Sequence, residues 1–253
     1  MTDRPYSLDR EITIRAHPET VFRYFTDSER FARWWGAGST IEPSPGGRVR
    51  IQYPNAVVVT GEVVVIDPPR QIVFTYAYGE GPVADASLVT VSLDPVAEGT
   101  RLRLRHDFSS EAIRDAHVQG WRYQLGVFSR VVSEEAHAKA AERVDAFLRA
   151  WGEPDPVTRR GLLESCAAPG IVFRDAFSAT DGLDEMLANL DAVRVHMPGV
   201  SLTRAGDVRL AHGTALVAWT ARKASGDEVG RGTNLVDFAP DGRIARMIGF
   251  WDR

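Results

Sequence analysis

Alternating apolar and polar residues mark much of the first half of the chain as half-buried β-strands. The alternation starts in residues 10–16, where Ile12 and Ile14 lie between charged neighbours, and a two-residue period is typical of a strand with one buried face. Further runs of this kind follow, separated by turn sequences such as PSPGG and DPPR. They cover residues 47–53, 57–67, 71–78, 86–94 and 100–108.

Two of these runs indicate which side chains would face inward. In residues 71–78, one face carries Ile72, Phe74, Tyr76 and Tyr78. In residues 100–108, one face carries Leu102, Leu104 and His106, and three arginines alternate with them. This pattern predicts an antiparallel sheet with one buried face and one face in water.

Apolar residues at helical spacing predict three helices in the same half. The first covers residues 18–27 and starts with Pro18, which suits a first helical turn because its missing N–H has no partner there. A second covers residues 29–35, and a long one runs from about Glu111 to Val132. Its predicted inner face holds Ile113, His117, Trp121, Leu125, Phe128 and Val132. The order of elements predicts a curved antiparallel sheet wrapped around this long helix, with a cavity between them.

The second half places helices before strands. Helical patterns in residues 143–151, 157–167 and 180–196 surround a short strand at residues 171–175. The remainder, residues 200–252, alternates like strands and contains the hairpin turn sequences ASGD and PDG. This order predicts a cone made of a four-stranded antiparallel meander with a helical lid.

The predicted fold class is therefore α+β in both halves. It consists of a helix-grip antiparallel sheet around a long helix, followed by an α+β cone with a curved antiparallel sheet. The charged, alanine-rich segment 133–143 has no packed pattern of its own and marks the junction. We predict two domains, residues 1–135 and 136–253, and each is long enough to bury its own core.

Composition and charge narrow the classes of function. The 253 residues carry a formal net charge of −4 without a basic cluster, so neither a nucleic acid nor a membrane is an expected partner. No run approaches the ~18 apolar residues of a membrane span, and the N-terminus has no apolar signal region. A single cysteine, Cys166, cannot form an internal disulfide, which favours a reducing, cytoplasmic location. We interpret Cys166 as a buried apolar side chain rather than a nucleophile.

Motifs for metals and cofactors are missing from the sequence. The six histidines form neither HxxxH nor HExxH. The PSPGG segment lacks the lysine and the following helix of a phosphate-binding loop. We therefore expect no metal site and no cofactor.

Motifs in both halves resemble known families. The first half carries AHPETVFRYFTDSERFARWWG, PGGRVR, GEVVVIDPPRQIVFTY, GTRLRLRH and HVQGWRYQL. Through these segments, residues from about Arg10 to Ser133 resemble the START-like (SRPBCC) superfamily in its activator-of-heat-shock-chaperone branch. The second half carries FLRAW, VFRD, GTNLVDF and DGRIARMIGFWD, and residues from about Arg143 to Arg253 are similar to the SnoaL-like branch of the nuclear-transport-factor-2-like superfamily. Both superfamilies include binders, cyclases and isomerases, so the resemblance implies a cavity but no single function.

Aromatic and polar residues of the first domain are candidates for a ligand pocket. They are Trp35, Tyr76, Tyr78, His106, Trp121 and Gln124. Rings with polar tips are common in ligand sites, although the same residues would also fill a core. His106 would be either an acid–base group or a hydrogen-bonded structural histidine.

The SnoaL-like resemblance points to Asp175 and Asn234 in the second domain. Isomerases of that superfamily place an aspartate base at the end of the first strand, an acidic donor on a later strand and a tyrosine on the first helix. Asp175 and Asn234 match the first two positions, but Ala146 or Phe147 stands where the tyrosine would be. A carboxylate in an apolar pocket can take a proton from a carbon beside a carbonyl, and an amide can donate to the oxyanion that forms. Otherwise Asp175 is a structural residue bonded to backbone or to an arginine such as Arg204.

Other residues of the second domain have simpler expected roles. Trp219 is predicted to line the cone, where it would bind ligand, or to lie at a dimer contact. Asp237 lies on the opposite strand face from Asn234 and is predicted to be exposed to solvent. His196 complements a helix dipole at the end of its helix, and Asp252 is a candidate polar lining residue.

Together these features favour the binding of a small, largely apolar molecule, polyketide-, lipid- or sterol-like, in one or both cavities. The alternative is a cyclase or isomerase that uses Asp175, or His106 in the first domain, for proton transfer. A third function, a co-chaperone-type interaction, is suggested only by the name of the resembled branch. The apolar outer faces of residues 214–223 and 243–251 favour a homodimer through the second domain.

Overall fold

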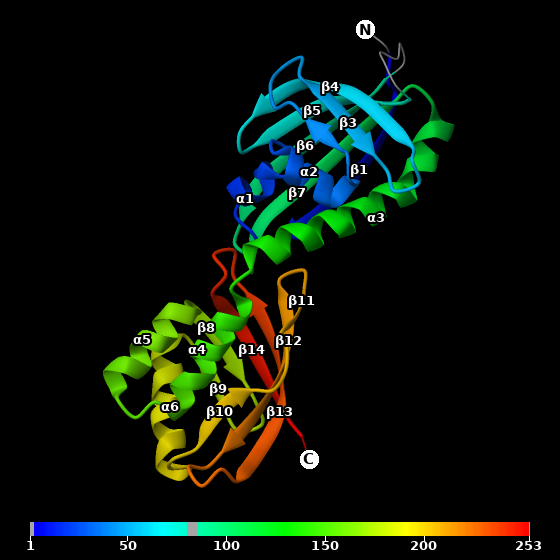
Figure 1. Cartoon of the computed structure of the whole chain (residues 1–253). Coiled ribbons are helices and arrows are strands. Elements are labelled where there is room, and N and C mark those ends of the chain that lie inside the picture. Colours follow the sequence, from blue (N-terminus) through cyan, green and yellow to red (C-terminus); the bar gives the residue numbers. More distant parts are fainter. Residues whose placement is uncertain (1–2, 80–85, 253) are drawn as a thin grey trace. The chain divides into compact units, whose positions relative to one another are not determined.

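A computed structural model describes residues 3–79 and 86–252. The chain divides into two compact units, Met1–Ser133 and Glu134–Arg253 (Figure 1). Both units are mixed α+β structures, and each contains one curved, open sheet. The fold class predicted from the sequence is confirmed.

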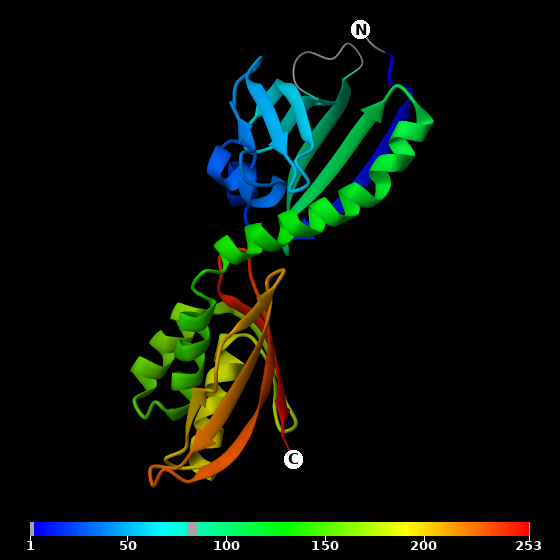
Figure 2. The same ribbon diagram turned by 45° about the vertical axis from the view of Figure 1, so that its right-hand side comes forward.

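The first unit is built on an antiparallel sheet whose strand order is β1-β7-β6-β5-β4-β3-β2. Its strands are β1 Tyr6–Ile14, β2 Thr40–Ile41, β3 Arg48–Gln52, β4 Val58–Asp67, β5 Gln71–Tyr78, β6 Ser87–Val96 and β7 Gly99–Phe108. Its helices are α1 Pro18–Arg23, α2 Ser28–Trp35 and the long α3 Glu111–Ala136. Figures 1 and 2 both show α3 lying along one face of this sheet.

The buried face of α3 follows the helical period only from its third turn onward. Trp121, Leu125, Phe128 and Val132 are buried as predicted. Ile113 is 46% exposed, so its prediction as an inward residue is wrong. The first turn instead carries surface ion pairs from Arg114 to Glu111 (2.9 Å) and Asp115 (2.7 Å), which keep it in water.

The second unit packs three helices against a mixed sheet with the order β10-β12-β13-β14-β8-β9, and β11 also pairs with β12. The helices are α4 Ala140–Gly152, α5 Pro156–Cys166 and α6 Leu183–His196. The strands are β8 Ala167–Arg174, β9 Ala179–Asp181, β10 Ser201–Arg204, β11 Arg209–Ala211, β12 Thr214–Arg222, β13 Glu228–Phe238 and β14 Ile244–Trp251. The helices cover one face of the sheet (Figure 1).

The sheet of the second unit differs from the predicted four-stranded meander. The run at residues 200–212 forms two short strands because the chain bends at Gly206, whose φ of 85° is easily adopted only by glycine. Both pieces pair with β12. The first strand, β8, joins the sheet parallel to β14 and forms an antiparallel pair with β9.

Asp237 is buried, with 7% of its surface exposed, so its prediction as solvent-exposed is wrong. Its face was assigned correctly by alternation, since the side chain lies opposite to Asn234. Thr214 Oγ1 donates to one carboxylate oxygen at 2.6 Å, and Arg246 Nε donates to the other at 2.9 Å. These two partners cover the carboxylate and satisfy it.

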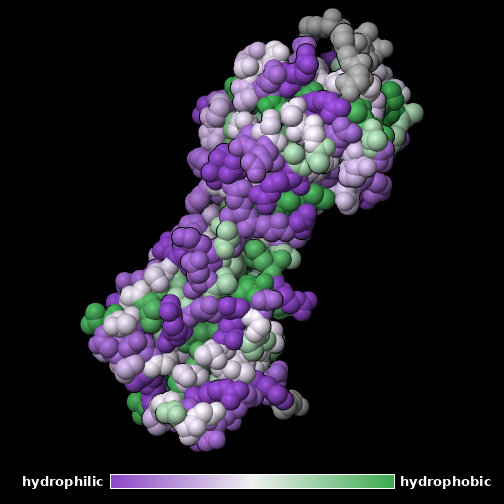
Figure 3. All heavy atoms as spheres, in the orientation of Figure 1, coloured by the Kyte–Doolittle hydropathy of each residue, from purple (hydrophilic) through white to green (hydrophobic). Residues whose placement is uncertain are grey.

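The surface is mainly hydrophilic and is interrupted by small apolar patches in the view of Figure 3. Among the described residues, none of the helices combines the length and apolar character needed to cross a membrane.

Candidate functional site

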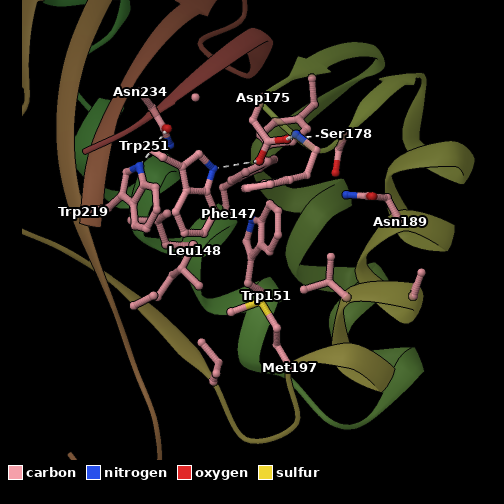
Figure 4. Close-up of a pocket in the computed structure, with 18 of the residues that line it drawn as sticks. Phe147, Leu148, Trp151, Asp175, Ser178, Asn189, Met197, Trp219, Asn234 and Trp251 are labelled. Atoms are coloured by element: carbon pink, nitrogen blue, oxygen red, sulfur yellow. Dashed lines mark hydrogen bonds between the residues drawn. The ribbon is translucent and has the colours of Figure 1, made fainter. Parts of the chain in front are cut away.

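The second unit contains a cavity of about 510 Å³ between its helices and the inner face of its sheet. Its walls are mainly aromatic and aliphatic, and include Phe147, Leu148, Phe173, Val193, Val200 and Leu202. A few polar side chains converge on it, namely Asp175, Ser178, Asn189 and Asn234 (Figure 4), and His196 also lines it. Apolar walls with a small number of placed polar groups are typical of small-molecule sites.

Asp175 follows β8 and is held by the turn that comes after it. Its Oδ1 accepts hydrogen bonds from the backbone N–H groups of Phe177 (2.8 Å) and Ser178 (2.7 Å). Its Oδ2 has one longer contact, from Trp251 Nε1 at 3.3 Å. No arginine is bonded to Asp175 among the described residues, and Arg204 instead pairs with Asp145. Oδ2 is therefore the oxygen left to meet a ligand.

Asn234 on β13 faces the same cavity but is largely engaged by the protein. Trp219 Nε1 donates to its Oδ1 at 2.9 Å. Because an indole nitrogen can only donate, this bond fixes the orientation of the amide. The amide nitrogen then faces the sulfur of Met247 at 3.2 Å, a weak acceptor.

Gly249 on β14 leaves the space in which Asp175 and Asn234 approach each other. A Cβ at this position would lie 3.1 Å from Asn234 Oδ1 and 3.2 Å from Asp175 Cβ. Both distances are shorter than ordinary van der Waals contacts. Any larger residue here would push into the polar end of the cavity.

The structure thus brings the predicted residues Asp175, Asn234 and Trp219 into one pocket. The expected polar lining residue Asp252 is instead exposed, 3.9 Å from Arg231, and its neighbour Trp251 lines the cavity. His196, assigned only to a helix end, lines the cavity as well.

Sequence reasoning missed Trp151 and Asn189, which line the helix side of the cavity. A signal for Asn189 exists, because it is a polar residue between Met186 and Val193 on the inner face of α6. No comparable signal marks Trp151, since a tryptophan in an apolar helical stripe is expected in any core.

The first unit contains a smaller hollow of about 240 Å³. Of the predicted ligand-binding residues, Trp35, Tyr76, Tyr78, Trp121 and Gln124 line it. Tyr53, Asn55 and His117 also line it. Its mouth includes Tyr78, whose hydroxyl lies 3.3 Å from His117 Nε2.

The two buried tyrosine hydroxyls of this hollow remain uncharged. The hydroxyls of Tyr53 and Tyr76 lie 2.7 Å apart and share one hydrogen bond. Burial raises the pKa of Tyr53 to about 12, and burial also raises the pKa of Tyr76 well above its ordinary value. Gln124 donates to the carbonyl of Trp34. The buried indole nitrogen of Trp35 has no partner among the described residues.

His106 does not line the hollow, which corrects its assignment as a ligand-binding residue. It is fully buried, and Trp121 Nε1 donates to its Nδ1 at 2.9 Å. Its Nε2 must then carry the proton and donate to Ser87 Oγ (2.7 Å), which in turn donates to the carbonyl of Tyr76 (2.7 Å). Burial, with a smaller contribution from His117, lowers the pKa of His106 to about 2. The imidazole is a neutral structural link rather than an acid–base group.

Cys166 is buried, as expected. Burial raises the pKa of its thiol to about 12, so the thiolate needed for nucleophilic attack is scarce at neutral pH. Among the described residues, no group of three or more His, Cys, Asp or Glu side chains could hold a metal ion.

One family model matches the first half of the chain. Residues 15–133 match the family model of the activator of Hsp90 ATPase homolog 1-like proteins. No curated protein matches the chain.

Solved structures are similar to parts of the chain. A SnoaL-like family protein from Agrobacterium tumefaciens is 28% identical and covers 47% of this chain and 99% of its own, with a TM-score of 0.43. A protein from Mesorhizobium loti is 22% identical and covers 49% and 94%, with a TM-score of 0.44. These two lie over the C-terminal part. CalU16 from Micromonospora echinospora is 25% identical and covers 49% and 74%, with a TM-score of 0.39.

The family match falls entirely within the first compact unit, and the motifs named above form α1, α2, part of α3 and the strands β3, β4, β5 and β7. Over residues 15–133, the first unit is therefore similar to the activator of Hsp90 ATPase homolog 1-like family.

Proposed function

We propose that the second unit binds one small, largely apolar molecule of polyketide-, lipid- or sterol-like character in its cavity. The observation that carries this proposal is the cavity itself. Its volume of about 510 Å³ lies within the range of about 300–1,000 Å³ common for small-molecule sites. Its aromatic walls can pack against the apolar surface of a ligand, and its few polar groups can orient the ligand by hydrogen bonds. The hollow of the first unit, with the unpartnered Trp35 indole nitrogen among the described residues, supports a second, smaller site.

Filling the cavity is expected to prevent binding. In Gly249→Val, the added side chain occupies the space between Asp175 and Asn234. The affinities of a hydrophobic fluorescent dye, and of the polyketides, sterols and fatty acids that displace it, should therefore fall at least about tenfold. A loss of about 1.4 kcal/mol in binding free energy corresponds to that factor. Titration of the dye and its competitors measures the change.

The matched control is Gly170→Val, another strand glycine in the same unit, where an added Cβ meets no atom within 4 Å. It should bind like the unmodified protein. Equal binding by both variants, or no binding of dye or competitors to the unmodified protein, would reject the proposed cavity function.

Proton transfer by Asp175 is a second candidate function. The specific observation in its favour is the state of the carboxylate, in which Oδ1 is held by two backbone N–H groups while Oδ2 faces the cavity. An oriented carboxylate in an apolar pocket can remove a proton from a carbon beside a carbonyl. The amide of Asn234 is a poor partner in this reaction, because Trp219 and Met247 already engage it.

We also propose that the second unit forms a homodimer through the outer face of its sheet. Leu216, Leu235 and Ile248 are direct cross-strand neighbours on β12, β13 and β14. Phe250, on the same face, is 57% exposed. A contiguous apolar row of this kind is typical of an interaction surface.

Charges at both ends of this apolar row suit a second copy of the same chain. Arg246 pairs with Asp237 at 2.9 Å on one side, and Arg231 lies 3.9 Å from Asp252 on the other. The end with Arg231 and Asp252 offers both signs of charge, and at the other end the buried carboxylate of Asp237 offsets the charge of Arg246. A two-fold related copy therefore meets no uniform repulsion.

Ile248→Arg is expected to convert the dimer to a monomer, because it places a charge in the centre of the apolar row. Light scattering coupled to size exclusion gives the mass of the unmodified protein and of the variant. The control Val157→Arg changes another exposed apolar residue, on α5, and should leave the mass of the dimer unchanged. A monomeric mass for the unmodified protein would refute the dimer.

A cytoplasmic location is proposed on the state of the cysteine. Cys166 is buried and free, which is the usual condition of cysteines in reducing compartments. Cell fractionation with an antibody to the protein tests this, and recovery outside the cytoplasm would contradict it.

A further inference from the structure

The cavity of the second unit has two polar walls that differ in how well their groups are bonded. The sheet wall carries Asp175 and Asn234, and each accepts a hydrogen bond from a tryptophan, Trp251 and Trp219 respectively. The helix wall carries the third tryptophan of the cavity, Trp151 on α4, and Asn189 on α6. The indole N–H groups of the sheet wall therefore have acceptors within the protein. The polar groups of the helix wall differ from them in this respect.

Trp151 is buried, with only 8% of its surface exposed, and its Nε1 has no acceptor among the described residues. In Figure 4, this nitrogen faces the interior of the pocket and no dashed line reaches it. An indole nitrogen is only a donor, so no change of orientation turns it into an acceptor. Buried donors are nearly always hydrogen-bonded, and an exception calls for a partner such as a ligand.

Asn189 repeats this observation from the neighbouring helix. Its buried Nδ2 also has no acceptor among the residues that the structure describes. Figure 4 shows its amide pointing into the cavity from α6. Two buried donors from different helices thus face one cavity without partners inside the protein.

The charge of the cavity limits what the two donors would accept. Among the described residues that line it, none is a lysine or an arginine, and one, Asp175, is an acid. A carboxylate or phosphate on the ligand would enter an apolar site without a lysine or arginine as counterion and beside a like charge, which is unfavourable. A neutral oxygen avoids this cost, and a carbonyl oxygen is an acceptor that either donor can bind.

We propose that Trp151 Nε1 and Asn189 Nδ2 form a subsite for a neutral carbonyl oxygen, and that the ligand of this cavity is an apolar ketone. This inference rests on the proposed binding function and names the class of its ligand. The subsite lies on the helix wall and is separate from the Asp175 and Asn234 pair on the sheet wall. A ketone bound there is anchored by its oxygen on the helices, and the carbon beside its carbonyl points towards Asp175 and the rings of the sheet wall.

Pairs of rigid ligands that differ only in the carbonyl group test this subsite. Suitable pairs are fluorenone and fluorene, tetralone and tetralin, and androstanone and androstane. In the unmodified protein, each ketone that binds should shift the indole N–H proton resonance of Trp151 downfield, whereas its hydrocarbon should not. The resonance is identified by its loss in Trp151→Phe.

Affinities give a second, independent readout. The ratio of ketone affinity to hydrocarbon affinity should fall about five- to tenfold in Trp151→Phe, and by a similar factor in Asn189→Leu, as expected for the loss of a neutral hydrogen bond. The hydrocarbon controls for changes in packing, because it loses the same apolar contacts as the ketone. If a variant does not fold, the response of the Trp151 indole resonance in the unmodified protein still tests the carbonyl subsite.

The two proposals fail in different ways. If the ketones and hydrocarbons bind, but the Trp151 resonance does not respond to any ketone and the affinity ratio is unchanged in the variants, the carbonyl subsite is rejected and the binding function stands. If no member of any pair binds, both are rejected.

Discussion

Asp175→Asn is expected to slow proton removal from a bound ketone by at least about 100-fold, the usual scale for loss of a general base. The amide oxygen can still accept from the N–H groups of Phe177 and Ser178, so the turn that holds the side chain is retained. Its nitrogen replaces Oδ2, the one oxygen left to meet a ligand, and cannot take a proton. Incorporation of deuterium beside the carbonyl of a ketone that carries α-hydrogens, such as tetralone, measures the rate in heavy water.

Asp181→Asn is the matched control for this experiment. Asp181 is an exposed carboxylate on the adjacent strand β9 and pairs with Arg174 at 2.7 Å, away from the cavity lining. Its replacement should leave the exchange rate unchanged. An equal rate in Asp175→Asn and the unmodified protein, with melting temperatures within a few degrees, would remove Asp175 as the base and leave ligand binding as the function.

Acidification is expected to destabilise the first unit through His106. The pKa of this histidine is about 2 in the folded protein against an ordinary value of 6.5, so between these values the unfolded chain binds a proton that the folded chain does not. The neutral His106 contributes fully to the free energy of unfolding above pH 6.5, and this contribution is lost progressively as the pH falls towards 2. Each pH unit below 6.5 lowers the free energy of unfolding by about 1.4 kcal/mol. The loss therefore amounts to about 3 kcal/mol at pH 4.5.

Residue-resolved hydrogen exchange measures the decrease in the free energy of unfolding of the first unit separately from that of the second unit. In His106→Gln, whose side chain can also accept from Trp121 and donate to Ser87, the unit should be less stable at pH 7.5 but should lose less stability on acidification. The imidazole nitrogens of His106 should also show no titration near neutral pH by nuclear magnetic resonance. A midpoint between pH 6 and 7 would contradict the buried, neutral role.

Much of the fold was accessible from local patterns. Leu102 and Leu104 face inward and the arginines between them face outward because alternation along a strand is a geometric property of the extended chain. The same reasoning placed Trp121, Leu125 and Phe128 on the buried face of α3, where the helical period applies. It failed at Ile113, because a period says which face a residue occupies but not how far along the helix the covering sheet extends.

The candidate site was predictable only in part. Asp175, Asn234 and Trp219 were named from strand positions and from resemblance, and the structure brings them into one cavity. Trp151 and Asn189 were not named, since they come from α4 and α6 and become neighbours of that cavity only when both helices pack on the sheet.

The sequence by itself determined the α+β class, the order of elements in each half, and the faces on which most side chains lie, because these follow from periodicity and turn chemistry within short segments. Only the tertiary structure decided what each polar group contacts. It made His106 a neutral link between Trp121 and Ser87, buried Asp237 beneath Thr214 and Arg246, and left the indole of Trp151 without an acceptor among the described residues. The physical reason is that hydrogen bonding and burial depend on partners distant in the chain, and a local pattern carries no information about them.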